Sequence, residues 1–109
     1  MTREALSKHL MLVHEGLQAL IARRTLSEEQ FLADGTVQEA AAYRLLQVVE
    51  SCFKLALGLL ELKGLRATET YGEAFRKLFY KGVISESLKN QFEDLVKFRN
   101  RLVHVYMGY

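Results

Sequence analysis

Apolar side chains at helical spacing constrain the fold of this chain more than any other feature. In residues 3–24 they recur every three or four positions, which places them in one stripe along an α-helix. The members of this stripe are Leu6, Leu10, Val13, Leu17, Leu20 and Ile21. The sequence has no proline that would force a helix to kink or end, and no segment shows the alternation typical of a strand. The sequence therefore predicts an all-α fold.

Ser, Thr and Gly residues mark the expected helix boundaries. A Ser or Thr oxygen accepts the first free amides of a helix, and a Glu or Gln three residues later can reach back to the cap. Such boxes pair Ser27 with Gln30, Thr36 with Glu39 and Thr70 with Glu73, and Thr2 and Ser85 are simpler caps. Left-handed ends are expected at Gly35, Gly64 and Gly82. The predicted helices span residues 3–24, 28–34, 37–63, 71–81 and from 86 into the C-terminal region.

The segment 37–63 is apolar around most of its circumference. Its polar side chains are confined to one narrow arc that contains Arg44, Gln47, Ser51 and Lys54. A helix on the surface of one small bundle would not need so wide an apolar face. We therefore expect this helix to be central in an up-and-down bundle of four to five helices, and the bundle to form a two-fold homodimer.

The length favours a single domain, residues 1–109, and the cysteine content favours a protein of a reducing compartment. The chain has a net charge of +2, which identifies no partner, and its single Cys52 cannot form an intrachain disulfide. No stretch reaches the ~18 apolar residues of a membrane span, and the charged N-terminus does not resemble a secretory signal. We expect a soluble cytoplasmic protein without a cofactor. His9 and His14 stand about 140° apart on a helix, so a metal site there is not expected.

Arg99 lies at the centre of the apolar stripe of the last predicted helix. A guanidinium has no neutral form at cellular pH, so an arginine that faces a core needs a carboxylate, several carbonyls or a bound anion. The sequence leaves two interpretations open. Arg99 pairs with an internal acid, for which Glu50 is the candidate, or it lies in a cleft and binds phosphate.

His104 follows Arg99 by five residues, which places the two side chains about 140° apart on an ideal helix. They share a site only if the backbone loosens near Val103, if the arginine side chain swings round, or if a dimer brings two copies of the segment together. A single histidine near a chain end is more often an ordinary surface residue.

The run Arg99-Asn100-Arg101-Leu102-Val103-His104-Val105-Tyr106 resembles the signature of HEPN ribonucleases, and its His-x-Tyr ending resembles the HepT-like branch of that family. The resemblance extends to residues 41–50, which are similar to the family's long helix, and to residues 71–78 and 82–85. It covers about two-thirds of the chain, from residue 36 to the end.

This resemblance implies a homodimer with a composite cleft that cleaves RNA without a metal ion. By the same resemblance, His104 acts as base or acid and Arg99 holds the phosphate. Asn100 orients the phosphate or supports the motif, and Arg101 helps to follow the backbone of a single strand. Glu50, the candidate partner of Arg99, is counted with these supporting residues.

The tyrosine of the His-x-Tyr ending, Tyr106, carries a further implication. In the HepT-like branch a partner nucleotidyltransferase of the MNT type serves as antitoxin and attaches AMP to this residue, which would block the cleft. By its helical position alone, Tyr106 could instead pack in the core. Family members usually continue past this tyrosine, and a chain that ended at Tyr109 would have a more open cleft.

Two other classes of function remain open. The bundle could be a non-catalytic substrate-binding subunit of a nucleotidyltransferase complex, which would have no reason to keep Arg99 and His104 in one cleft. A purely structural helical module would explain the wide apolar face of residues 37–63 but not an arginine that faces the core. The leading hypothesis is the ribonuclease toxin.

Overall fold

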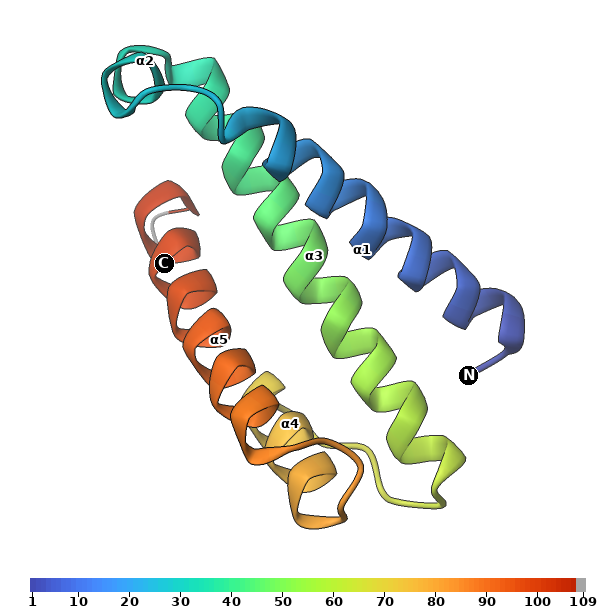
Figure 1. The fold of residues 1–109 in the computed structure, drawn as a ribbon. Coiled ribbons are helices and arrows are strands. Elements are labelled where there is room, and N and C mark those ends of the chain that lie inside the picture. Colours follow the sequence, from blue (N-terminus) through green and yellow to red (C-terminus); the bar gives the residue numbers. More distant parts are fainter. Residues whose placement is uncertain (108–109) are drawn as a thin grey trace.

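The computed structural model describes the backbone of residues 1–107 and the side chains up to Val105. These residues form five α-helices and no strand (Figure 1). The helices are α1 (Arg3–Arg23), α2 (Glu28–Ala33), α3 (Gly35–Leu62), α4 (Tyr71–Tyr80) and α5 (Glu86–Met107). The all-α prediction is confirmed, and the predicted helices correspond to the observed ones with small differences at their ends.

Most of the predicted caps are present. The Ser27 side chain accepts from Gln30 N, and the Gln30 side chain accepts from the backbone N–H of Ser27. Thr70 accepts from the backbone of Glu73, and Ser85 accepts from Leu88 N at 3.1 Å. These bonds satisfy amides that the first turn of a helix leaves free, which explains why α2, α4 and α5 begin where they do.

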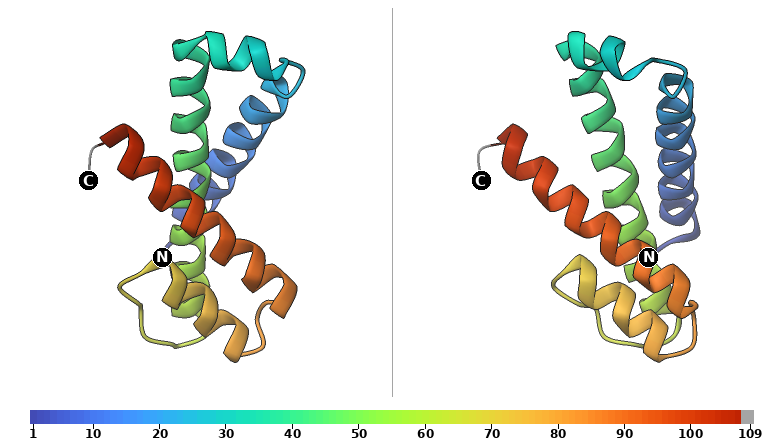
Figure 2. Two further views of the ribbon diagram at one scale, coloured as in Figure 1. Left: turned by 90° about the vertical axis from the view of Figure 1, so that its left-hand side faces the viewer. Right: turned by 60° about the vertical axis from the view of Figure 1, so that its left-hand side comes forward.

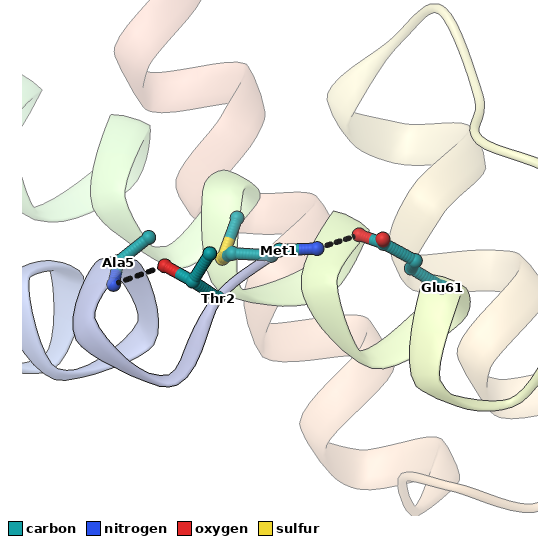
Figure 3. Close-up of polar contacts among 4 residues, drawn as sticks. All are labelled: Met1, Thr2, Ala5 and Glu61. Carbon is teal, nitrogen blue, oxygen red and sulfur yellow. Dashed lines mark hydrogen bonds and ion pairs between the residues drawn. The ribbon is translucent and has the colours of Figure 1, made fainter.

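The N-terminal end of α1 is fastened twice. Figure 3 shows the Thr2 hydroxyl accepting from Ala5 N, at 3.0 Å, and the terminal amine of Met1 paired with the Glu61 carboxylate near the end of α3. The first contact caps α1, and the second ties the start of α1 to the C-terminal end of α3. The two helices are therefore antiparallel neighbours.

The predicted boundary between α2 and α3 is wrong. The capping box of Thr36 with Glu39 does not form, because the Asp34 carboxylate caps α3 by accepting from the backbones of Thr36 and Val37 at 3.0 and 3.2 Å. Aspartate is at least as strong a cap as threonine, and it stands two residues earlier. The helix therefore begins at Gly35, which is helical rather than left-handed, whereas Gly64 and Gly82 have the positive φ values expected of helix ends, 69° and 76°.

α3 is the central helix, as its wide apolar face predicts. α1, α2, α4 and α5 all pack against it, and α1 lies along it (Figures 1 and 2). The buried core joins the C-terminal half of α3 to α4, and the Phe75 ring of α4 stacks on Phe92 of α5 with centroids 4.3 Å apart. The buried residues of this cluster are Ala56, Leu60, Ala74, Phe75 and Leu78.

The molecule is more open than a closed bundle of its length. Its radius of gyration is 15.3 Å, whereas a compact domain of this size has about 13 Å. Figure 2 shows the reason, since α5 crosses α3 and its C-terminal end points away from the α1–α3 pair. Within the described residues, no helix is both long and apolar enough to cross a membrane. The open arrangement leaves the C-terminal half of α5 accessible on several sides.

Close approach of α1 to α3 requires glycine at position 16. A Cβ added there would lie 2.5 Å from Val48 Cγ2 and 3.3 Å from the Arg44 carbonyl oxygen. Val48 is buried and β-branched, so it cannot easily move aside. Gly16→Ala gains up to about 1 kcal/mol of helix stability, but overpacking costs about 1–3 kcal/mol.

We therefore expect Gly16→Ala to lower the free energy of unfolding by about 1 kcal/mol in urea titrations. In a Val48→Ala background the clash with the valine methyl is absent and only the 3.3 Å approach to the Arg44 carbonyl oxygen is left, so the cost of Gly16→Ala should be smaller. A Gly16→Ala chain as stable as the parent would contradict this account of the α1–α3 contact.

Candidate active site around Arg99

Arg99 on α5 faces α3 and forms an ion pair with it. Its Nη2 donates to Glu50 Oε1 at 2.8 Å, and the Arg99 and Glu50 side chains are 23% and 42% exposed. The internal acid that the sequence offered as one interpretation is therefore present. Both side chains keep contact with solvent, so the pair is not sealed in the core. An anion from solvent can therefore reach Arg99, and the second interpretation, a phosphate site, is compatible with this burial.

Two further contacts hold the guanidinium. Arg99 Nη1 donates to Asn100 Oδ1 at 3.1 Å, and its Cζ lies 5.0 Å from the ring centroid of Tyr71. The Tyr71 ring in turn packs edge-on against Phe53, with centroids 4.3 Å apart. The Nε of Arg99 is buried and has no hydrogen-bond partner among the described residues. The arginine is thus held by its two terminal nitrogens, and its Nε–H has no partner among the described residues.

Tyr71, the first residue of α4, lies beside the Arg99–Glu50 pair, and the pKa of its phenol is shifted. Burial, followed by the hydrogen bond and negative charge of Glu50, raises its pKa from the ordinary 10.0 to about 12, although the positive charge of Arg99 acts in the opposite direction. The phenol therefore remains protonated beside the ion pair throughout the physiological range. It can donate to Glu50 while its ring contacts Arg99.

This perturbation predicts a separate titration step. In an ultraviolet absorbance titration, one tyrosine should ionise near pH 12, and Tyr71→Phe should remove that step. Because the folded-state pKa lies above the unfolded value, the stability linked to this protonated phenol is complete below pH 10 and is lost as the pH rises toward 12. Retention of the late step in Tyr71→Phe would contradict this assignment.

Arg99 also lines a cavity of about 630 Å³ between α1, α3 and α5. His9 and Leu12 come from α1, and Arg99 and Val103 come from α5. The α3 wall consists of Tyr43, Leu46, Gln47, Glu50, Ser51 and Lys54. The polar arc of α3 that the sequence indicated therefore faces this cavity, apart from Arg44.

His104 is exposed and is not among the described residues that line this cavity. α5 is a regular helix through this region, so the backbone does not loosen near Val103, and Arg99 is held on Glu50 rather than swung toward the imidazole. Of the three routes by which the two could meet, only contact between two copies is left. Arg101 is exposed as well, and the side chain of Tyr106 lies outside the described part of the structure.

The sequence did not indicate that His9 and Tyr71 belong near Arg99. His9 lies at the edge of the α1 stripe, and Tyr71 directly follows a helix cap. Each residue therefore fits the pattern of its own helix, and neither pattern indicates a role in a site. Their position depends on how α1 and α4 pack on α3, which spacing within one helix does not specify. In the described part of the chain, no group of three or more His, Cys, Asp or Glu side chains is arranged to hold a metal ion.

Comparisons with known proteins agree with the resemblance in the C-terminal run. A search of curated proteins and a search of solved structures found no match. The comparison with protein families matched the family described as ribonuclease HepT-like over residues 3–108, nearly the whole chain. The chain therefore belongs to the HepT-like ribonuclease family.

Proposed function

We propose that this protein is an RNA-cleaving toxin in which Arg99 binds the phosphate and His104 transfers the proton. The observation that carries the proposal is the fixed guanidinium beside an accessible cavity, held by Glu50, Asn100 and Tyr71. A donor oriented before the substrate arrives stabilises charge on phosphorus oxygens without reorganising during the reaction. The family gives the same class of activity.

The reaction uses groups of the RNA and of the protein. His104 removes the proton of a ribose 2′-hydroxyl, and the 2′-oxygen attacks the adjacent phosphorus. The new O–P bond forms as the bond to the 5′-oxygen breaks, and a water molecule gives this leaving oxygen a proton. The protonated His104 then gives its proton to the hydroxide that remains. Arg99 stabilises the charge on the phosphorus oxygens.

In this proposal the site forms between two copies, with Arg99 of one near His104 of the other. The open shape of the chain favours such an assembly, because apolar side chains on the C-terminal half of α5 remain uncovered. Phe98 is 46% exposed and Val105 is 73% exposed. Phe98 and Leu102 also line an apolar hollow with Leu20, Phe31, Ala41, Ala42 and Leu45. A second copy that covers this hollow would bury these side chains close to His104.

Glu50 and the two residues after Arg99 have supporting roles. Glu50 orients the arginine in the absence of substrate, and a phosphate competes with the carboxylate for the same donors. Asn100 holds the other side of the guanidinium, and the exposed Arg101 contacts the strand outside the cleft.

The direct test is cleavage of a single-stranded RNA by the purified chain in the presence of EDTA. The proposal predicts products that end in a 2′,3′-cyclic phosphate, because the attacking oxygen belongs to the RNA. Intact RNA after prolonged incubation with folded, dimeric protein would contradict it.

A non-catalytic binding subunit for a nucleotidyltransferase is the second candidate function. The pairing of Arg99 with Glu50 and the position of His104 outside the cavity favour it, since both are compatible with a site that binds without reacting. RNA or nucleotide binding without cleavage, together with a stable complex with an MNT-type nucleotidyltransferase, would support this candidate over the toxin.

We further propose that Tyr106 is the site at which the antitoxin acts. Co-expression with a cognate MNT-type nucleotidyltransferase and ATP is expected to add one or more AMP units to the chain and to stop RNA cleavage, because the added phosphate competes for Arg99. Intact-protein mass spectrometry measures the addition, and Tyr106→Phe is the matched control. AMP addition that persists in Tyr106→Phe would assign the modification to another residue.

A further inference from the structure

We propose that the cavity between α1, α3 and α5 binds one unstacked nucleobase of a single-stranded RNA, with Tyr43 stacking on the base and His9 contacting its edge. The inference rests on the proposed function, because it identifies which part of the RNA lies beside Arg99. It adds a specificity pocket that involves neither His104 nor Tyr106.

The size and lining of the cavity suit a flat, largely apolar group. Its volume is about 630 Å³, which lies in the ordinary range of small-molecule pockets, about 300–1,000 Å³. Leu12, Leu46 and Val103 provide apolar walls on all three helices. Proteins that read single-stranded RNA commonly stack splayed bases on aromatic side chains or arginine planes and bind the base edges with a few polar groups.

The charge of the lining favours a ligand that carries a phosphate. Lys54 and Arg99 contribute two positive charges, and Glu50 contributes the one negative charge among the lining residues. Glu50 is already paired with Arg99, whereas Lys54 is exposed at the edge of the site. A base attached to a sugar-phosphate backbone satisfies both the apolar walls and the excess positive charge.

His9 is the polar side chain in the α1 wall of the cavity. Its Nδ1 is buried and has no hydrogen-bond partner among the described residues. Gln47 is different, because its Nε2 donates to the Leu12 carbonyl oxygen at 3.1 Å and its Oε1 accepts from Arg44 at 3.0 Å. An imidazole can donate or accept, so it can distinguish base edges, whereas Gln47 is already occupied in joining α1 to α3.

Tyr43 supplies an aromatic face where the cavity opens. The side chain lines the cavity, and yet the residue is 64% exposed. A large aromatic side chain with so much exposed surface gains little from the packing of the fold. Stacking of a base on such a ring is worth about 1–3 kcal/mol, which corresponds to about five- to 150-fold in affinity.

The test uses the full chain and four 2′-O-methyl trinucleotides that differ only in the central base, so that binding is measured without cleavage. By isothermal titration calorimetry, the trinucleotide with the preferred base should bind at least about tenfold more tightly than the weakest.

Tyr43→Ala should weaken the binding of all four trinucleotides by about tenfold, and Tyr43→Phe should not. His9→Ala should reduce the preference among bases by about tenfold while weak binding persists. His14→Ala and Tyr80→Ala are the matched controls, because both residues are exposed and lie outside the cavity lining. Neither substitution should change the binding.

The outcomes separate this inference from the proposed function. Base-dependent binding that requires His9 and Tyr43, in a chain that cleaves no RNA, would support the pocket and contradict the nuclease. RNA cleavage by a chain whose binding is unchanged in His9→Ala and Tyr43→Ala would support the nuclease and overturn the pocket. Equal affinity for a free mononucleoside monophosphate and for the trinucleotide would assign the cavity to a free nucleotide and overturn the RNA-strand inference.

Discussion

RNA cleavage should fall by about a hundred- to a thousandfold when Arg99 is replaced by alanine, because the substitution removes the donor that we propose to stabilise charge on the phosphorus oxygens. Arg99→Lys keeps the positive charge but loses the planar fork that reaches Glu50 and Asn100 together, so it should recover little of the rate. Single-turnover cleavage of a labelled RNA measures both effects.

His104→Ala should lower the rate of RNA cleavage by about a hundredfold or more, because it removes the group proposed to transfer the proton.

The control for these variants is an exposed arginine outside the site, Arg66→Ala, which should cleave at the parental rate. Circular dichroism melting establishes that each variant is folded, which is expected because the Arg99–Glu50 pair is partly exposed and contributes modestly to stability. Parental cleavage rates in folded Arg99→Ala would refute its role in phosphate binding.

Phe98→Glu should convert the proposed dimer to a monomer and abolish cleavage. The Phe98 ring is 46% exposed and lines an apolar hollow with Leu102 of α5. If a second copy covers this region, a glutamate there would place an unpaired charge in the interface, which costs several kcal/mol. Size-exclusion chromatography with light scattering reports the mass, and the same samples report RNA cleavage.

Tyr80→Glu is the matched control, since Tyr80 on α4 is 74% exposed and lies outside this hollow. It should remain dimeric and active. A dimeric Phe98→Glu variant with full activity would exclude this side of α5 from the interface. A parental chain that is monomeric at micromolar concentration and still cleaves RNA would contradict the composite site itself.

Local patterns specified most of the fold. Ser27, Thr70 and Ser85 cap the helices that they were predicted to cap, because a cap interacts only with the next few residues. The prediction failed between α2 and α3, where Asp34 caps the helix in place of Thr36 by accepting from the backbone amides of Thr36 and Val37. Two capping residues that stand two positions apart allow two different helix starts, and the sequence pattern alone does not decide between them.

The candidate site was predictable only in part. The position of Arg99 within an apolar stripe indicated that it needs a partner, and Glu50 is that partner. The cavity was not predictable, because His9 and Tyr43 belong to different helices and meet only through the packing of α1 on α3. The separation of His104 from Arg99 follows directly from the helical period once α5 is regular through both residues.

Mixing two inactive variants tests the composite site most directly. Arg99→Ala and His104→Ala chains are unfolded together, refolded and assayed for RNA cleavage. In a mixed dimer, one of the two sites combines the intact Arg99 of one copy with the intact His104 of the other. Since half of the dimers are mixed, the account predicts recovery of about a quarter of the parental activity. No recovery, in a sample shown by mass spectrometry to contain mixed dimers, would contradict it.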